Sequence, residues 1–264
     1  MPRKLSFTLQ FSFTILVALF LILPAIMSML AGITTNYARG VSSGLTASWI
    51  IEVWNLYADT IVRSLVLAFT TLVCTLLVGV PAAYALHTIG GRIARLIEEV
   101  ITLPLAIPGL AIALALIITY GGSGSFRQSS AFILVGHVVF TMPFMVRSVM
   151  AVLGSIDVST LEEGAASLGA SRWQRFITVV VPNVRPGILA GSLMVVTLSL
   201  GEFNLTWMLH TPLTKTLPVG LADSYASMRL EIASAYTLVF FVMIVPLLVA
   251  MQIMGQKQSR SSKS

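Results

Sequence analysis

Long apolar stretches alternate with short polar connections along this chain. The hydrocarbon core of a bilayer is roughly 30 Å thick, and a helix of about 20 mostly apolar residues crosses it. Six stretches come close to that length: Phe11–Ala31, Ser64–Leu86, Val100–Tyr120, Ser129–Val146, Gly187–Leu209 and Ile232–Met254. Among them only the fifth contains an Asp, Glu, Lys or Arg residue, which is Glu202. The pattern predicts an all-α polytopic membrane protein with six transmembrane helices.

The composition supports a membrane location and argues against other classes of protein. Of the 264 residues, 56% are hydrophobic and 10% are charged, whereas soluble domains carry about 25% charged residues. So little charge does not cover the surface of a soluble globule, and so apolar a chain is not intrinsically disordered. The formal charge of +6 comes from basic residues that are scattered rather than gathered in a stripe, so we expect no nucleic-acid binding.

The basic residues indicate the orientation of the spans, because inner loops of membrane proteins are enriched in Lys and Arg. With the N-terminus inside, 11 of the 16 basic residues lie on the inner side and 5 on the outer side. The inner ones are Arg3, Lys4, Arg92, Arg95, Arg147, Arg172, Arg175, Arg185, Lys257, Arg260 and Lys263. We therefore expect both termini to be cytoplasmic. No A-x-A cleavage pattern follows the first span, which we interpret as a retained helix rather than a signal peptide.

The connection between the fourth and fifth spans, residues 147–186, is the longest inner loop and the densest in charge. Within it, Ser159 and Thr160 are each followed three residues later by a glutamate, Glu162 and Glu163. This spacing is typical of a capping box, in which the two side chains satisfy open N–H groups of a first helical turn. The sequence therefore predicts that a short helix begins at Ser159 and Thr160.

The same loop contains the signals for the end of that helix and the start of another. Small residues 164–167 fill the first helix, Gly169 is placed to end it in a left-handed conformation, and Ser171 can cap a second helix that runs until Pro182. A short helix with a small-residue surface suits docking into a groove of another protein. An amphipathic helix pair resting on lipid headgroups fits the same spacing equally well.

A resemblance favours docking. Glu163-Gly164-Ala165, three residues, Gly169, nine residues and then Val-Val-Val-Pro ending at Pro182 resemble the EAA loop of ABC importer permeases, E-A-A-x3-G-x9-I-x-L-P. The chain departs from that pattern at Gly164, Val179 and Val181; glycine in place of alanine lowers helix propensity by roughly 1 kcal/mol. The resemblance implies that the ATPase-docking residues are Glu162, Glu163, Gly164, Ala165, Ala166, Leu168, Gly169, Ala170 and Pro182.

The resemblance extends over about residues 59–254 and is strongest to permeases for polyamines, ferric iron, thiamine, sulfate and aminoethylphosphonate. It implies an N-terminal helix and outer loop (1–58), a permease core (59–254) with the EAA-type loop at about 155–185, and a disordered cytoplasmic tail (255–264). It further implies a subunit of the bacterial inner membrane without a catalytic site. The expected partners are a cytoplasmic ABC ATPase dimer, a second identical or homologous permease and an external substrate-binding protein.

The residues agree with that division of labour. The chain has no G-x-x-x-x-G-K-[ST] phosphate-binding loop, so we expect no cofactor in this chain, with ATP and Mg²⁺ bound by the partner ATPase. The residues do not choose among a polyamine, aminoethylphosphonate, thiamine and ferric iron as the substrate. Anionic sulfate fits least well, because a carboxylate inside a span would repel it.

Polar residues inside the fifth span suggest a solute pathway. A charge within a membrane costs at least about 2.5 kcal/mol, so Glu202 should face protein or water. On a helical wheel Ser199, Glu202 and Thr206 share one arc with Gly191, which makes these three residues a candidate pathway. Alternatively, Glu202 lies near the outer end of the span and anchors the helix in interfacial water. Gly187 and Gly191 form a G-x-x-x-G pair, which predicts close helix packing, either within the chain or against a second permease.

Two other functions compete on the residues alone. An ion-coupled secondary transporter usually shows inverted repeats and intramembrane ionisable relays, to which a single Glu202 gives little support. An intramembrane serine protease needs a serine activated by a base, but Ser123 and Ser125 lie in an outer turn and His137 lies well down the next span. Because His137 shows no partner pattern, we interpret it as a packed, hydrogen-bonded residue.

Overall fold

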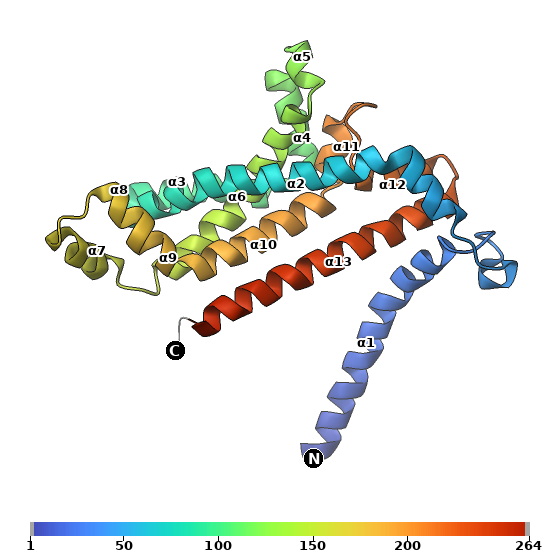
Figure 1. The fold of residues 1–264 in the computed structure, drawn as a ribbon, viewed down its shortest axis with the longest axis horizontal. Coiled ribbons are helices and arrows are strands. Elements are labelled where there is room, and N and C mark those ends of the chain that lie inside the picture. Colours follow the sequence, from blue (N-terminus) through green and yellow to red (C-terminus); the bar gives the residue numbers. More distant parts are fainter. Residues whose placement is uncertain (1–2, 262–264) are drawn as a thin grey trace. The chain divides into compact units, whose positions relative to one another are not determined.

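The computed structural model describes residues 3–261, and this part of the chain is helical, without a strand (Figure 1). Its elements are α1 (Arg3–Ala31), η1 (Gly40–Ser43), α2 (Ser48–Ile89), α3 (Gly91–Thr102), η2 (Leu103–Leu105), α4 (Gly109–Tyr120), α5 (Gly124–Arg127), α6 (Ser130–Leu153), α7 (Val158–Ser167), α8 (Arg172–Arg175), π-helix η3 (Phe176–Val180), α9 (Val181–Asn183), α10 (Arg185–Gly201), α11 (Asn204–Leu209), α12 (Leu217–Ala226) and α13 (Leu230–Ser261). The predicted all-α membrane fold is confirmed.

The number of spans is less regular than the sequence predicts. Among the described residues, four helices are long and apolar enough to cross a membrane by themselves, within α1, α2, α6 and α13. Two further candidates are bent pairs of helices: Gly91–Leu105 with Gly109–Tyr120, and Arg172–Asn183 with Arg185–Gly201. The structure therefore has four such helices, or up to six if each bent pair forms one span.

The predicted third span, Val100–Tyr120, is not one continuous helix. α3 ends at Thr102 and runs into η2, which ends at Leu105; α4 starts at Gly109, and the two parts are bent by 105°. Pro108 stands directly before α4 with ψ of 139°, outside the helical region. Proline also disfavours a helical conformation in the residue before it, here Ile107, and cannot donate a backbone hydrogen bond. The break therefore follows from proline chemistry that the apolar pattern alone does not reveal.

The predicted fifth span, Gly187–Leu209, is also interrupted. α10 ends at Gly201, Glu202 is extended with ψ of 119°, and α11 restarts at Asn204. A second bend, of 73°, lies upstream, where Pro186 occupies the first turn of α10. Proline suits a first helical turn because its missing N–H would have no partner there. The continuous helix assumed for the pathway arc is therefore wrong.

Contacts divide the chain into two compact units. The first joins Met1–Asp59 to Gly220–Met243, and the second joins Thr60–Val219 to Ile244–Ser264. In the first unit, Arg229 forms an ion pair with Glu52 and donates a hydrogen bond to the Tyr57 hydroxyl. The expected functional division of the chain into 1–58, 59–254 and 255–264 stays a prediction.

The second unit is built around the packing of α10 on α6. A Cβ on Gly187 would lie 2.5 Å from the carbonyl oxygen of Ser148, and a Cβ on Gly191 would lie 2.8 Å from the Met145 sulfur. Only glycine lets the two helix backbones approach this closely. The G-x-x-x-G pair therefore packs within the chain, against α6.

The C-terminal helix extends further than the sequence suggests. α13 continues through Ser261, whereas the tail 255–264 is expected to be disordered. Its Gln and Lys residues have high helix propensity, so they extend the preceding apolar helix. Residues 262–264, with the Lys263 counted for orientation, lie outside the described residues.

Candidate functional site

The exposed helix α7 begins one residue after Asp157, which caps it. The Asp157 carboxylate accepts a hydrogen bond from the Thr160 backbone N–H at 3.2 Å and from the hydroxyls of Ser159 and Thr160 at 2.7 and 2.6 Å. The predicted capping box is therefore wrong, because Ser159 and Thr160 donate to a cap rather than act as one. An ionised carboxylate has two acceptor oxygens and no proton, which suits it to collect all three donors.

These hydrogen bonds change the acidity of the cap. They lower the pKa of Asp157 from 3.8 to about 2, through the Thr160 hydroxyl first, then the Ser159 hydroxyl and the Thr160 N–H. Hydrogen bonds to a carboxylate favour its charged form. Asp157 is therefore ionised at neutral pH and holds the first turn of α7 in place.

The end of α7 has the geometry predicted for it. Gly169 has φ of +82°, its N–H donates to the Ala166 carbonyl at 2.9 Å, and the Ala170 N–H donates to the Ala165 carbonyl at 3.1 Å. Together these two bonds form a Schellman motif, in which the left-handed residue is normally glycine. The position of Gly169 as the terminator of this helix is confirmed.

A second capping motif starts the return arm of the loop. The Ser171 hydroxyl accepts from the Gln174 N–H at 3.3 Å, and the Gln174 side-chain oxygen accepts from the Ser171 N–H at 2.8 Å. The predicted cap at Ser171 is thus confirmed. The helical path then passes through π-helix η3 and continues to Asn183 in α9, so Pro182 does not end it. Pro182 lies in the first turn of α9, where a missing N–H is tolerated.

α7 presents an apolar tip to its surroundings. The Leu168 side chain is 89% exposed, and a Cβ added at Gly164 would meet no atom within 4 Å. An isolated exposed leucine is ordinary on a soluble surface. At the end of a helix fixed by caps on both sides, it forms a rigid knob beside a surface of small residues. We call α7 and the Leu168–Ala170 turn the docking hairpin, after the role that the resemblance to the EAA loop implies.

The docking hairpin is tied to a long helix by its first glutamate. The Tyr84 hydroxyl on α2 donates to the Glu162 carboxylate at 2.7 Å, and the Tyr84 ring packs against Phe176 of η3 with centroids 5.2 Å apart. Trp173 stacks on the same Phe176. A displacement of α7 would therefore act on α2 and on the return arm at the same point.

The second polar region is buried, at the break between α10 and α11. The Glu202 carboxylate accepts from the backbone N–H groups of Leu205 and Thr206, both at 2.9 Å, and from the Thr206 hydroxyl at 3.1 Å. The first N–H groups of a helix have no partner within it, and Glu202 supplies that partner for α11. It is 9% exposed.

His137 on α6 completes this buried cluster. Its Nδ1 lies 2.8 Å from the Ser199 hydroxyl and its Nε2 lies 2.8 Å from the Thr206 hydroxyl. A hydroxyl has one proton, so when Thr206 donates to Glu202 it accepts from Nε2–H, and Nδ1 accepts from Ser199. We call Ser199, Glu202, Thr206 and His137 the buried joint.

The structure thus brings the three candidate pathway residues together, although not through one continuous helix. His137 joins them from 62 and 69 residues away, a separation at which no local sequence pattern could reveal the contact. The interpretation of His137 as a packed, hydrogen-bonded residue is confirmed. Both of its ring nitrogens are engaged, so it does not serve Ser123 or Ser125 as a base.

The two chain breaks meet at the buried joint. A Cβ on Gly109, the first residue of α4, would lie 3.3 Å from Oε1 of Glu202, and α11 packs against α4. The N-terminal end of α4 carries partial positive charge, which stabilises a nearby carboxylate. No group of three or more His, Cys, Asp or Glu side chains that could hold a metal ion occurs among the described residues.

These features define a multi-pass helical membrane subunit that carries a structured, exposed hairpin between two of its membrane helices. Residues 75–260 match the model of the family described as binding-protein-dependent transport system inner membrane component, and the chain belongs to this family of ABC importer permeases. It is accordingly a permease subunit of an ABC importer in a bacterial inner membrane. The EAA motif and its coupling helix are typical of this family.

Relatives and solved structures agree with that assignment. The chain is 27% identical over 252 residues to a 2-aminoethylphosphonate transport system permease protein, PhnV, of Salmonella typhimurium, covering 92% of this chain and 94% of the relative. It is 31% identical to the molybdenum transport system permease protein ModB of Azotobacter vinelandii, covering 66% and 83%.

Two solved structures share the fold. One is a bacterial ABC transporter involved in the import of the acidic polysaccharide alginate, with a TM-score of 0.70, 16% identity and 96% of both chains covered. The other is the MetNI methionine ABC transporter in inward-facing conformations, with a TM-score of 0.62, 18% identity and coverage of 80% of this chain and 97% of the other. At these identities the likeness concerns the fold alone.

Proposed function

We propose that the docking hairpin inserts into a cytoplasmic ABC ATPase dimer and transmits ATP-driven closure to the membrane helices. The observation that carries this proposal is the apolar knob at Leu168, 89% exposed on a helix capped at both ends. Buried apolar anchors in a partner's pocket commonly dominate interface energy, and rigid presentation lowers the entropy lost on binding. ATP and Mg²⁺ belong to the ATPase in this arrangement.

A hairpin on the cytoplasmic side sets the orientation of the whole chain. Residues 155–185 and both termini then lie in the cytoplasm, in agreement with the distribution of Lys and Arg. The complete importer contains a second permease, identical or homologous, and an external substrate-binding protein. In this assembly residues 59–254 provide the translocating core, and 1–58 add the first helix and outer loop.

The proposed substrate is a small phosphorus or metal oxyanion, with 2-aminoethylphosphonate as the first candidate. The support for this substrate is a relative named for 2-aminoethylphosphonate transport, which aligns with nearly the full chain, together with relatives named for molybdenum transport. The buried joint bears on the choice, because the Glu202 carboxylate is occupied by two backbone N–H groups and a hydroxyl. It is therefore not a free anionic ligand for a polyamine, and the argument from Glu202 against an anion disappears.

The pathway role of Ser199, Glu202 and Thr206 stays a prediction. All three are buried in mutual or His137 hydrogen bonds, which favours a positioning role at the meeting point of two broken helices. Broken helices commonly surround transport sites because their ends expose backbone groups there. The joint would then hold the pathway open or closed rather than line it.

The docking proposal is tested with a pair of exposed leucines. Leu168→Asp places a charge on the knob, while Leu213→Asp changes a leucine that is 81% exposed in another loop. Because neither side chain is buried, both variants should fold. We expect Leu168→Asp to lose co-purification of the ATPase and ATP-dependent uptake, and Leu213→Asp to retain co-purification. Full coupled transport by Leu168→Asp would overturn the docking assignment.

The substrate proposal needs a separate measurement. Uptake of labelled 2-aminoethylphosphonate, molybdate and putrescine is compared in cells that express the complete importer, with the chain deleted as the control. We expect loss of uptake of an oxyanion on deletion. Selective loss of putrescine uptake would overturn the oxyanion assignment while leaving the importer assignment in place.

A further inference from the structure

Helix α7 has an inward and an outward face. Val158 at its start is buried, with 4% of its surface exposed, and Glu162 and Ala165 are half-buried. These three residues are spaced i, i+4 and i+7, so they share one face of the helix. Val158 belongs to the same apolar cluster as Ala83 of α2. This face of α7 is therefore the one that packs on the membrane helices.

The second glutamate of α7 lies on the outward face. Successive residues of a helix are about 100° apart around its axis, which turns Glu163 away from the face that Glu162 occupies. Glu163 is exposed, and its carboxylate forms no hydrogen bond or ion pair in the part of the chain that the structure describes. The two adjacent glutamates are therefore in different environments.

Glu162 is fixed to α2 by a residue far away in the sequence. The Tyr84 hydroxyl donates to the Glu162 carboxylate at 2.7 Å, across 78 residues of chain, and hydrogen bonds to an ionised acceptor are among the strong ones. The Tyr84 ring packs against the apolar cluster of α2 and α6 on one side and against Phe176 on the other. The hydroxyl is therefore held in place, and its bond to Glu162 joins the inward face of α7 to α2.

This bond is not needed to form α7 itself. The helix is capped by Asp157 at its start and closed by the turn at Gly169, and Val158 anchors it in the apolar cluster. Removal of the Tyr84 hydroxyl should therefore leave α7 folded. What it removes is the polar connection between the middle of α7 and α2.

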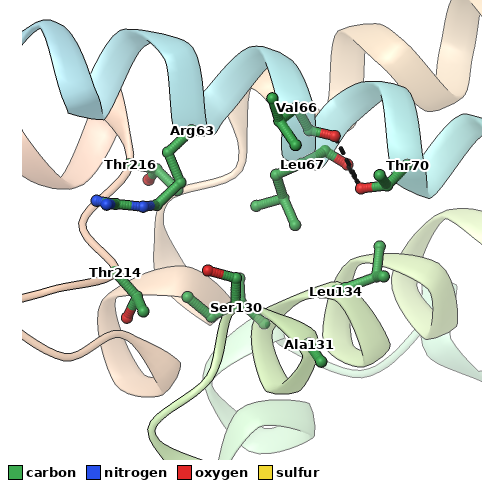
Figure 2. A pocket seen from close by; sticks show the side chains of 10 residues that line it. Arg63, Val66, Leu67, Thr70, Ser130, Ala131, Leu134, Thr214 and Thr216 are labelled. Carbon is green, nitrogen blue, oxygen red and sulfur yellow. Dashed lines mark hydrogen bonds between the residues drawn. The ribbon is translucent and has the colours of Figure 1, made fainter.

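At its other end α2 forms one wall of a pocket. Figure 2 shows side chains of α2, among them Val66 and Thr70, facing Ala131 and other residues of the first turns of α6 across a cavity of about 230 Å³. Val66 and Tyr84 are 18 residues apart on α2, which corresponds to about 27 Å along a helix. Protein interiors are otherwise close-packed, so a cavity between α2 and α6 gives α2 room to shift at this end.

We propose that the Tyr84–Glu162 hydrogen bond transmits the ATP-driven displacement of α7 to α2, which then shifts against α6 at the pocket. Sliding of packed helices is a common form of such transitions. Tyr84 and Glu162 are positioning residues for transport, and Glu162 is not a contact of the ATPase, whereas Glu163 stays among the docking residues. The inference rests on the proposed function, because the docked ATPase supplies the displacement.

The test uses changes that remove single groups. Tyr84→Phe removes the hydroxyl and keeps the ring against Phe176. Glu162→Ala removes the acceptor, and Glu163→Ala is the same change on the outward face. Tyr120→Phe is the control for the loss of a hydroxyl, because Tyr120 is 54% exposed and its hydroxyl has no hydrogen-bond partner among the described residues.

The first measurement is the uptake per ATP hydrolysed in vesicles that contain the complete importer. The solute is the one that the deletion experiment selects from 2-aminoethylphosphonate, molybdate and putrescine. We expect Tyr84→Phe and Glu162→Ala to lower this ratio about tenfold, with normal co-purification of the ATPase. Their combination should be no worse than either alone, because both remove the same bond. Glu162→Gln keeps an acceptor oxygen and should retain more coupling than Glu162→Ala, and Tyr120→Phe should change nothing.

The second measurement follows the pocket and does not depend on the solute. Cys74 is the only cysteine of the chain, so in a Cys74→Ala background spin labels are attached at Val66→Cys and Ala131→Cys, on α2 and α6 (Figure 2). Dipolar broadening reports their separation without nucleotide and after trapping with ATP, Mg²⁺ and vanadate. We expect the separation to change on trapping, and the change to be lost when Tyr84→Phe is added.

Three results would overturn the inference. They are normal coupling in Tyr84→Phe, a label separation that is the same in both states or changes equally without the Tyr84 hydroxyl, and a loss of ATPase co-purification in Glu162→Ala as large as in Glu163→Ala. The last result would place Glu162 in the ATPase interface. Because Leu168→Asp tests docking itself, failure of the proposed function and failure of the Tyr84–Glu162 connection give different results.

Discussion

Two carboxylates do the same local work in opposite surroundings. Asp157 caps α7 at the exposed docking hairpin, and Glu202 caps α11 inside the buried joint. At the hairpin, water can accept hydrogen bonds from N–H groups that lose their cap. At the joint there is no such replacement, because a buried donor without a partner costs its full desolvation penalty. Loss of the capping hydrogen bond should therefore cost little stability at the hairpin and much more at the buried joint.

The largest effect is expected from Glu202→Ala. This change leaves the Leu205 and Thr206 N–H groups without their acceptor, at a cost of about 1–3 kcal/mol for each buried group. We expect a clear fall in the unfolding temperature of the purified complex, well beyond that of Asp157→Ala. Equal effects of the two variants would show that the comparison between buried and exposed caps is wrong.

Glu202→Gln separates positioning from lining. Glutamine keeps one acceptor oxygen, so we expect an intermediate loss of stability and uptake whose dependence on substrate concentration is unchanged. If Glu202 instead contacts the moving solute, the concentration dependence of uptake shifts while the unfolding temperature stays the same. Initial uptake rates over a range of substrate concentrations distinguish these results.

A smaller effect is expected where α7 ends. Gly169→Val forces a β-branched residue to φ near +82°, which costs roughly 1–2 kcal/mol for a residue with a Cβ. We expect ATP hydrolysis to continue without matching uptake, because the knob at Leu168 is no longer fixed. The matched control is Gly164→Ala, within the helix and with free space around the added methyl, which should stabilise α7 by roughly 0.5–1 kcal/mol. Coupled transport by Gly169→Val at the normal rate would contradict this.

The contrast also explains how far the sequence could predict the site. The docking hairpin depends on neighbours within a few residues, so Gly169 and the Ser171 cap could be predicted from spacing. A glutamate three residues after Ser159 and another after Thr160 predict that α7 begins at these two residues. The competing signal was Asp157, whose carboxylate is the stronger acceptor and stands directly before the helix.

Rules based on the spacing of neighbouring residues do not predict the buried joint. The polar arc predicts that Ser199, Glu202 and Thr206 lie together, and they do. They do not share one helix, however: the chain breaks at Glu202, and this residue caps α11 after the end of α10. His137 enters from α6 through tertiary packing alone. Likewise, the apolar pattern located membrane segments but not the bend before α4, since hydropathy averages over the prolines that cause it.

The smallest expected effect concerns pH at the exposed cap. The pKa of Asp157 is about 2 in the folded protein and 3.8 ordinarily, so folding favours the ionised form. Its contribution is fully present above about pH 4 and is lost as the pH falls through 2. Because Asp157 is exposed, we expect only the first turn of α7 to loosen, seen as faster amide exchange at Thr160 relative to amides of α6. Asp157→Asn should remove this pH dependence, whereas a pH-dependent Thr160 amide in that variant would show that another group controls the turn.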